Sequence, residues 1–441
     1  PLFPAVAWTE YGWYNWTGNP TQAWSNITLD LPLNSSVVIE WRFMARDVLG
    51  HITETPVETF VTPANDIFVF ALNSTAIQKW GLKYPITFKF NITNANGQDI
   101  VVKKRYSENG DWITLPTKTS NDYFNGIECV RFNFTEGMAY VSVSFNGSSK
   151  LYIAFFNATT EEMLLEDTVK YAGKAKYYDN RKCAVTYTWD DWRDFFNATK
   201  LEQLQTRFVY VLNMCQTYQL YCSVGIVTNQ TSPNAWSLLQ TEINEGYVWA
   251  ASHSRTHADL TNANYSTAIW EINGSRNDIL GNLTLPYGEY VWLFIGPFGI
   301  VGQANDNVRQ AISDSEYLIA RSTAIEKDYA DWYSEGGYYT IGIYKMLDSY
   351  KDDINTLKSF FDQGYENGYP MHFFGHPLEW NSTQLENLND FLNYTHGKKD
   401  VWYAPVEYIY QYRYLCPVSY THHRAHETSL HLVCRLLLEK K

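Results

Sequence analysis

The sequence contains few cysteines, no long apolar run and no excess of basic residues. Six cysteines in 441 residues are too few for a disulfide framework; one bridge, between Cys183 and Cys222, remains open. No run of 18 apolar residues occurs, so we expect no membrane-spanning helix. The net charge of −13 argues against nucleic acid or an anionic membrane surface as a partner.

The composition is that of a well-packed globular protein. Hydrophobic residues make up 45% of the chain, aromatic residues 17% and charged residues 18%. A chain of 441 residues is longer than one compact core usually holds, which predicts two or three domains. The first residue is Pro1 and no signal peptide precedes it; if the protein is secreted, we expect its true start to lie upstream.

Asparagine occurs in Asn-X-Ser/Thr sequons far more often than composition predicts. Fifteen of the 34 asparagines stand in sequons, whereas chance would give about 5. They are Asn15, Asn26, Asn34, Asn73, Asn91, Asn133, Asn146, Asn157, Asn197, Asn229, Asn264, Asn273, Asn282, Asn381 and Asn393. This density predicts a glycosylated extracellular or cell-surface protein. The alternative is a surface that is simply rich in Asn and Thr.

The last residues do not read like the rest of the chain. The segment 418–441 resembles a translated sequencing-library adapter in VSYTH, RAHET and LVCRLLLEKK, and it departs from the adapter at His423. We interpret 417–441 as a non-native tail, and its four histidines are therefore not candidate ligands. The native histidines that remain are His51, His253, His257, His372, His376 and His396.

The first 170 residues carry strand patterning and little helical periodicity. Residues 1–62, with VVIEWRF and VETFVT on either side of a turn-rich connector, predict part of an immunoglobulin-like or fibronectin-like β-sandwich. Residues 66–170 continue in this style, and ITFKFN at 86–91 alternates apolar and polar side chains. We expect a second β-sandwich there, either a carbohydrate-binding module or a plain spacer domain.

Near residue 180 strand-like apolar runs begin to alternate with helical stretches. CAVTYTW is followed by a helical segment, then CSVGIVT, another helical segment and VWAASH. This order predicts a parallel sheet or barrel. Residues 178–415 have the right length for a single α/β barrel. The expected protein is therefore multidomain, with β-sandwiches followed by a barrel.

TWDDW at 188–192 places two carboxylates at the end of an apolar run. Within a strand, Asp190 and Asp191 would point to opposite faces. At the carboxyl end of a strand, where the chain turns, both can face the mouth of a barrel, which is where active sites lie in parallel barrels. Taken alone, an Asp-Asp pair before a helix is also a common N-cap.

HSRTH at 253–257 places two histidines four residues apart. In a helix or helical turn this spacing puts both imidazoles on one face. A carboxylate with two imidazoles is a ligand set for a divalent metal. The alternative is an ordinary pair of surface histidines.

The order of these strings resembles the NodB-type polysaccharide deacetylases, which form carbohydrate esterase family 4. The resemblance covers about 180–415 and implies a distorted α/β barrel. It implies that Asp190 is the catalytic base, that Asp191, His253 and His257 bind one divalent metal, with Zn²⁺ expected, and that the substrate is an acetylated polysaccharide.

Three further strings extend the resemblance. FIGPFG at 294–299 looks like the third motif and implies that Pro297 and Phe298 border the substrate. DYADW fits the fourth motif, in which Asp331 would hold the catalytic imidazole and Trp332 would form an apolar wall. FFGHP fits the last motif and implies that His376 protonates the leaving amine.

The sequence departs from the family pattern close to this site. Ile295 stands where the family has the arginine that orients the base, Trp192 replaces a small glycine, and Pro377 follows His376 in place of an aspartate. Ile295 and Trp192 bear on base orientation and on substrate access. They motivate a second hypothesis, a catalytically degenerate surface glycoprotein that binds carbohydrate or plays a structural role.

The first hypothesis is a secreted metal-dependent hydrolase that removes N-acetyl or O-acetyl groups from an amino-sugar polysaccharide. A glycosidase that uses paired acids fits less well, because its carboxyl groups lie about 5 to 9 Å apart on opposite sides of one bond. Adjacent aspartates do not suit that arrangement, and the histidines would be left without a role.

Overall fold

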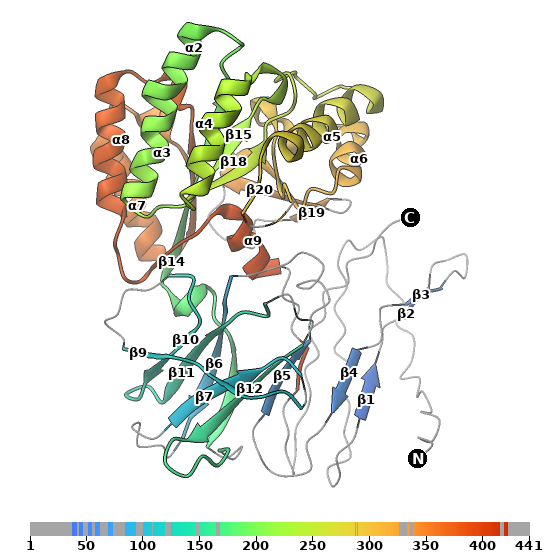
Figure 1. Ribbon diagram of the computed structural model, residues 1–441, viewed down its shortest axis with the longest axis vertical. Helices are drawn as coiled ribbons and strands as arrows, with labels where there is room; N and C mark the ends of the chain where they lie inside the picture. Colours follow the sequence, from blue (N-terminus) through green and yellow to red (C-terminus); the bar gives the residue numbers. More distant parts are fainter. Residues whose placement is uncertain are drawn as a thin grey trace.

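A computed structural model describes residues 84–414 apart from short gaps, together with a few strands outside this range. The gaps are 94–99, 108, 120–124, 147, 149, 165–167, 287, 289, 326–332 and 336–337. Outside 84–414 the described segments are 38–41, 44–46, 52–54, 58–61, 69–73 and 419–421. Two parts are visible, a barrel with helices around it and a body of β-sheet beneath it (Figure 1).

The second half of the chain forms the α/β barrel. Its sheet has the order β19-β20-β18-β17-β16-β15-β14-β22-β21, with β23 paired to β14, and every pairing except β19 with β20 is parallel. The strands are β14 Cys183–Trp192, β15 Cys222–Ile226, β16 Val248–Ser252, β17 Leu293–Ile295, β18 Ile319–Ile325, β19 Tyr333–Glu335, β20 Tyr338–Ile343, β21 Lys345–Met346, β22 Pro370–Gly375 and β23 Val401–Tyr403.

The barrel is nearly closed between β20 and β22. The backbone N–H of Tyr344 donates to the carbonyl of His372 over 2.6 Å, which joins the two edges of the sheet. All ten residues of β14 are buried, and so are all residues of β15, β16 and β22. Continuous burial is what strands of a parallel barrel require, because helices cover one face and the packed interior the other. The expected α/β barrel in the C-terminal part of the chain is confirmed, while its boundaries at 178 and 415 stay predictions.

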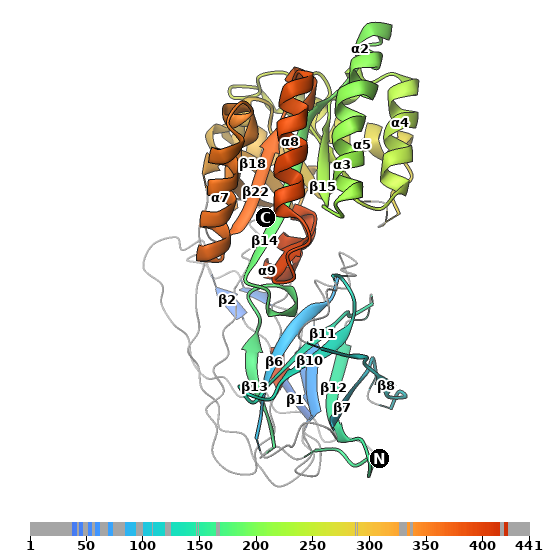
Figure 2. The ribbon, with the colours of Figure 1, turned by 90° about the vertical axis from the view of Figure 1, so that its left-hand side faces the viewer.

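Helices connect the strands on the outside of the barrel (Figure 2). They are α2 Ala198–Gln203, α3 Val209–Thr217, α4 Pro233–Asn244, α5 Tyr265–Asn282, α6 Asp306–Asp314, α7 Ile354–Asn367, α8 Ser382–Thr395 and α9 Val406–Tyr414. Asparagine caps several of them: the side chains of Asn197, Asn264 and Asn381 accept backbone N–H groups at the starts of α2, α5 and α8. These caps set the direction in which the chain leaves each loop at the barrel mouth.

Two described five-stranded sheets pack face to face in the β part. Their orders are β13-β6-β11-β10-β9 and β24-β5-β12-β7-β8. Phe70 of one sheet packs against Phe88 and Phe90 of the other. The strands are β5 Val69–Asn73, β6 Ile86–Ile92, β7 Ile100–Arg105, β8 Ile113–Thr114, β9 Thr117–Lys118, β10 Cys129–Asn133, β11 Met138–Val143, β12 Lys150–Asn157, β13 Val169–Lys174 and β24 Ser419–Thr421.

The immunoglobulin-like or fibronectin-like identity of these sheets stays a prediction. Of residues 1–62, the structure describes two short hairpin pairings, β1 Val38–Trp41 with β4 Glu58–Val61, and β2 Met44–Arg46 with β3 Ile52–Glu54. Of the tail 417–441, the structure describes only β24, which pairs with β5. The expected boundaries at 62, 66, 170 and 417 also stay predictions.

The β part contacts the barrel at the amino ends of its strands. Trp402 Nε1 donates to the Tyr84 hydroxyl over 2.8 Å, and Asn125 Nδ2 donates to the Tyr403 carbonyl over 2.6 Å. Tyr84 and Trp402 pack with Tyr178 in a buried aromatic cluster. This contact lies at the opposite end of the barrel from the carboxyl ends of the strands, so the barrel mouth stays open (Figure 1).

The structure bears on the expected disulfide bridge and on the expected absence of a membrane-spanning helix. Cys183 and Cys222 are both free thiols, and β14 pairs Cys222 with Tyr187, four residues along the strand from Cys183, so the suggested bridge is wrong. Within the described residues, the structure contains no helix that is both long and apolar enough to cross a membrane.

Candidate active site

Asp190 and Asp191 lie at a bulge near the carboxyl end of β14. Trp189 pairs with Val224 but Trp192 pairs with Ile226, so β14 contains one more residue than β15 over this step. Asp191 has a φ of 72°, in the left-handed region that non-glycine residues rarely adopt. The bulge and this φ reorient a side chain that regular strand geometry would point away, and both carboxylates reach the mouth.

His253 and His257 converge through a loop and not through a helix. Residues 253–257 follow β16 as a loop without helical structure, so the two imidazoles do not meet through helical spacing. Two left-handed residues, Ser254 at φ 63° and His257 at φ 60°, fold the loop back on itself. As a result the two imidazole rings lie 4.8 Å apart, edge to face.

A buried glutamate holds this loop in place. Glu271, on α5, accepts the backbone N–H groups of Arg255 and Thr256, both at 2.9 Å. The Ser254 hydroxyl accepts the backbone N–H of His257 over 3.0 Å. Because the loop's own polar groups are satisfied in this way, the two imidazoles are positioned by the backbone before any ligand binds.

Asp191, His253 and His257 form a group whose ligand atoms all lie within 4.8 Å of one another. Asp191 Oδ1 is 3.6 Å from His253 Nε2 and 3.4 Å from His257 Nε2. Ligand atoms at about 2.1 Å from a tetrahedral ion lie about 3.4 Å apart, so these separations fit a small divalent cation. Asp191 Oδ1 is also buried without a hydrogen-bond partner, which is the state expected of an atom that binds an ion.

The protonation states of His253 and His257 suit the binding of a metal ion. His253 Nδ1 lies 2.8 Å from the Ile295 carbonyl, so Nδ1 carries the proton and the lone pair of Nε2 faces Asp191. Burial lowers the pKa of His253. Burial and the neighbouring His253 lower the pKa of His257 to about 4. Both imidazoles are therefore neutral near pH 7, as metal ligands must be.

Asp190 is held by an arginine that the sequence reading overlooked. Arg321, on β18, binds the carboxylate through both terminal nitrogens, with Nη1 3.0 Å from Oδ1 and Nη2 2.5 Å from Oδ2. Both side chains are almost completely buried. Burial alone raises the pKa of Asp190, but the charges of Arg321 and of the nearby histidines outweigh it, and the pKa lies below its usual value. Asp190 is therefore ionised and oriented.

Arg321 occupies the strand position beside Ile295. The register of β17 and β18 pairs Ile295 with Arg321, and paired residues on neighbouring parallel strands project to the same side, about 4.8 Å apart. The guanidinium expected from position 295 thus comes from one strand further along. The signal in the sequence was a lone arginine in the apolar run YLIARS; in the structure α6 ends at Asp314 and β18 begins at Ile319.

A chain of buried hydrogen bonds holds Arg321 in turn. His372 Nδ1 lies 3.0 Å from the Gly342 carbonyl, which can only accept, so this nitrogen carries a proton. His372 Nε2 lies 2.9 Å from the Thr188 hydroxyl, which in turn lies 3.1 Å from Arg321 Nη1. Burial lowers the pKa of His372 to about 3, so its Nε2 accepts from Thr188 and the Thr188 oxygen is free to accept from Arg321.

His376 lies on the other side of Asp190 and is oriented by Asp348. His376 Nδ1 is 2.9 Å from Asp348 Oδ2, and its Nε2 is 3.9 Å from Asp190 Oδ2. Burial by itself lowers the pKa of His376, but the hydrogen bond to Asp348 and the charge of Asp190 outweigh burial and raise it to about 9. His376 is therefore a cation near pH 7. Asp348 had not been singled out from the sequence.

The fourth sequence motif, DYADW, lies outside the described residues, and so do its two candidates, Asp331 and Trp332. The imidazole nitrogen that Asp331 was expected to hold is bonded to Asp348, and the other faces Asp190. Asp348 also accepts from the backbone N–H of His376 and from the indole of Trp380, so its position is fixed.

The remaining sequence candidates border the mouth. Phe298 is 69% exposed, and its ring lies edge-on to His257 at 4.7 Å. Pro297, next to it, is buried. Trp192, by contrast, is fully buried against Phe208; its expected effect on substrate access stays a prediction.

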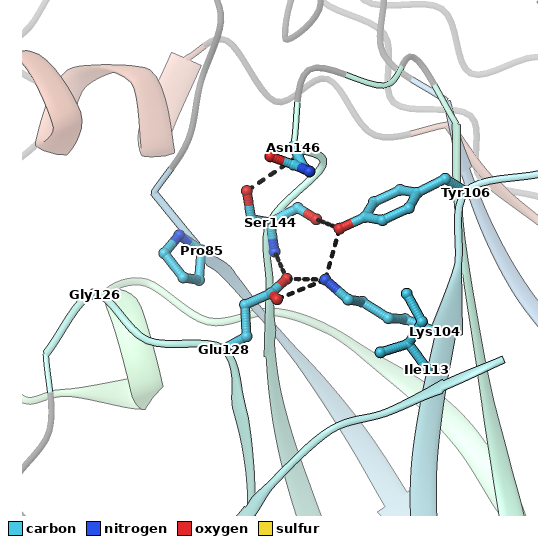
Figure 3. Close-up of a pocket in the computed structure, with 8 residues that line it drawn as sticks. All are labelled: Pro85, Lys104, Tyr106, Ile113, Gly126, Glu128, Ser144 and Asn146. Atoms are coloured by element: carbon cyan, nitrogen blue, oxygen red, sulfur yellow. Dashed lines mark hydrogen bonds and ion pairs between the residues drawn. The ribbon is translucent and has the colours of Figure 1, made fainter. Parts of the chain in front are cut away.

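A separate hollow of about 420 Å³ lies in the β part, away from the barrel mouth. Its polar groups bind one another: Lys104 Nζ donates to Glu128 and to the Tyr106 hydroxyl, and Tyr106 donates to the Ser144 carbonyl (Figure 3). Because these groups are already paired, none of them points to a ligand.

The known proteins that this chain resembles match the part of it that forms the barrel. The family model described as polysaccharide deacetylase matches residues 178–320. Among solved structures, the chain is similar to a protein described as a polysaccharide deacetylase from Mycobacterium smegmatis, with 12% identity, a TM-score of 0.43, and coverage of 53% of this chain and 90% of the other.

A second such protein, from Pseudomonas aeruginosa PAO1, shows 12% identity and a TM-score of 0.43 over 54% of this chain and 93% of the other. A family 4 carbohydrate esterase from Streptomyces lividans, in complex with acetate, shows 16% identity and a TM-score of 0.33 over 51% and 91%. A search of curated proteins found no match. The segment 178–320, which contains the buried Asp190 and the clustered side chains of Asp191, His253 and His257, matches the polysaccharide deacetylase family.

Proposed function

We propose that this protein is a metal-dependent hydrolase that removes N-acetyl groups from an amino-sugar polysaccharide. The convergence of Asp191, His253 and His257 beside Asp190 carries the proposal. Zn²⁺ is the ion that we propose, because a carboxylate with two imidazoles suits it and leaves positions open. The same ligands would also suit iron, cobalt or nickel.

The chain's own side chains supply both proton transfers. Asp190, ionised and held by Arg321, accepts a proton from the water that attacks the acetyl carbonyl carbon. His376, protonated through its contact with Asp348, donates a proton to the nitrogen as the carbon–nitrogen bond breaks. The products are acetate and a free amine. A bound metal would supply positive charge for the developing oxyanion.

The alternative, a catalytically degenerate deacetylase fold, loses part of its support. It was motivated by Ile295 in place of an orienting arginine, by Trp192 in place of glycine and by the dense sequons, of which the last still stands. Arg321 provides the guanidinium to Asp190, and Trp192 is fully buried against Phe208. Both features favour an active enzyme.

An extracellular or cell-surface location is part of the proposal. The 15 sequons support it. Expression in a glycosylating host followed by N-glycosidase digestion tests it, and the proposal expects a loss of mass corresponding to several glycans. A chain with unchanged mass after digestion would contradict it.

Release of acetate tests the activity. Zinc-loaded protein is incubated with N-acetylglucosamine oligomers and with acetylated xylan, and acetate is measured. We expect release from the amino-sugar oligomers and a loss of at least about 100-fold in the Asp190→Asn variant. An absence of acetate from every substrate, with metal bound at one equivalent, would contradict the proposal.

A further inference from the structure

Two exposed phenylalanines stand beside the reaction centre in an unfavourable backbone conformation. Phe195 is 48% exposed with a φ of 52°, and Phe196 is 65% exposed with a φ of 54°. Bulky residues rarely adopt this region, which costs conformational energy. Exposed rings gain little from burial in return. Phe298, whose ring lies next to His257, has the same combination, with a φ of 57°.

The backbone that carries Phe195 and Phe196 is held by hydrogen bonds to Gln230 and Asp194. The Gln230 carbonyl accepts the backbone N–H groups of Asp194 and Phe195, at 3.1 and 2.8 Å. The carboxylate of Asp194, which is buried, accepts the N–H of Phe196 at 3.2 Å and that of Ser232 at 2.9 Å. The two rings are thus presented to solvent by a fixed turn.

The same turn is connected directly to the metal-ligand group. Arg193 Cζ lies 5.0 Å from the centre of the Phe195 ring, and Arg193 Nη2 donates to Asp191 Oδ2 over 3.0 Å. The side chain of Gln230 accepts from Arg193 at 3.2 Å and donates to the carbonyl of Thr256, in the histidine loop, at 2.9 Å. Aromatic rings therefore lie close to the group at two points, Phe298 next to His257 and Phe195 next to Arg193.

We infer that Phe195 and Phe196 form a subsite for a sugar ring of the substrate chain, next to the acetylated sugar at the metal. The faces of a pyranose ring expose C–H groups that pack on aromatic rings, while its hydroxyls stay in water. Two rings are too small an area for a stable protein interface. Phe195 is connected to Asp191 through Arg193, and Phe196 follows it in the same turn, so a polymer held at the reaction centre would pass near them. This inference rests on the proposed function and makes the preferred substrate an oligomer.

Binding without turnover tests the subsite. In the zinc-loaded full chain carrying Asp190→Asn, calorimetry measures the affinity for N-acetylglucosamine and for its tetramer. Adding Phe195→Ala and Phe196→Ala is expected to weaken tetramer binding about tenfold or more and to change monomer binding by less than about twofold. Tyr210→Ala, which removes an exposed ring on α3, is the matched control and is expected to change neither.

Several outcomes would overturn the inference. Equal loss for monomer and tetramer, no loss for either, or a tetramer that binds no better than the monomer would each do so. A glycan attached to Asn197, which follows Phe196, is the other group that would cover the two rings. Thr199→Ala removes that sequon but leaves the Asn197 cap on α2, which uses the backbone N–H of Thr199. Tetramer affinity that appears only in this variant would show that the rings serve the glycan.

The subsite and the proposed activity fail separately. Length-dependent binding through the phenylalanines without any acetate release by the unsubstituted protein would leave the subsite standing and contradict the activity. Acetate release with tetramer affinity unaffected by the phenylalanine substitutions would do the reverse.

Discussion

Arg321 and Ile295 lie side by side on β18 and β17, and Arg321 is the one that binds Asp190. The guanidinium that orients the base is thus displaced by one strand, at the same height in the barrel. The surrounding residues accommodate the change. A Cβ atom on Gly225, on β15, would lie 3.2 Å from Ile295 Cδ1 and 3.5 Å from the Asp190 Cα, so this glycine leaves just enough space for the isoleucine.

Removing the arginine is expected to impair both activity and folding. In Arg321→Met the buried Asp190 loses its ionic partner, which destabilises proteins by about 3 to 5 kcal/mol. Arg321→Lys keeps the charge but not the bidentate geometry, and we expect a folded protein whose kcat/KM for acetate release is lower by about 10-fold or more. Urea unfolding and acetate release measure the two effects, and Arg309→Met, on the exposed surface of α6, is the control.

Exchanging the two neighbours should restore part of the loss. The double variant Ile295→Arg, Arg321→Ile returns the guanidinium to the strand that the family uses. We expect it to exceed Arg321→Met in kcat/KM by about 10-fold. If the exchanged protein is folded, binds metal and is no more active than the single variant, the equivalence of the two positions is wrong.

The raised pKa of His376 predicts how activity ends at high pH. As a proton donor His376 is competent only below its pKa, so kcat/KM should fall as pH rises through about 9. A bound divalent cation nearby would move this limb to lower pH. Asp348→Asn removes the carboxylate that raises the pKa, so the limb should shift further down. Glu366→Gln, which removes an exposed carboxylate that pairs with Lys182, is the control; equal shifts in both variants would refute the role of Asp348.

The same shift affects the stability of the metal-free protein. The folded pKa of about 9 exceeds the ordinary value of 6.5. Protonation of His376 therefore stabilises the fold fully below pH 6.5, and this stabilisation is lost as pH rises to about 9. Denaturant unfolding between pH 6 and 9.5 should show a steeper decline in the unsubstituted protein than in His376→Gln. Parallel curves would contradict the assignment.

Metal binding should stabilise the barrel. A ligand that binds only the folded state at 100 times its Kd adds about 2.7 kcal/mol. Zinc should therefore raise the melting temperature of chelator-treated protein, and Asp191→Asn or His257→Gln should abolish the rise. Asp348→Asn, which leaves the three ligand side chains intact, should retain it. An equal rise in all variants would place the binding elsewhere.

We expect Thr188 to affect activity only by positioning Arg321. Thr188→Val removes the hydroxyl between His372 and Arg321 and leaves two buried polar groups unpaired, at a cost of about 1 to 3 kcal/mol each. We expect a lower kcat with little change in KM, and recovery in Thr188→Ser, which keeps the hydroxyl. A change in KM alone would assign Thr188 to substrate binding instead.

The barrel and the cluster of Asp191, His253 and His257 could be predicted from the sequence because both follow from local sequence patterns. Both depend on local strings: buried parallel strands read as continuous apolar runs, and the ligands fall at strand ends. Arg321 and Asp348 were missed because their roles arise from the register of β17 with β18 and from the approach of the Leu347–Tyr350 turn to β22, which no local pattern encodes. The left-handed residues Ser254 and His257, which turn the HSRTH loop, were not recognisable from the four-residue spacing.

The aromatic contact between the β sheets and the barrel floor has a consequence for motion. Bending one part against the other would expose Trp402 and break its hydrogen bond to Tyr84, so this contact resists a hinge motion between the two parts. In the proposed enzyme, closure around a substrate would then fall to the loops at the mouth.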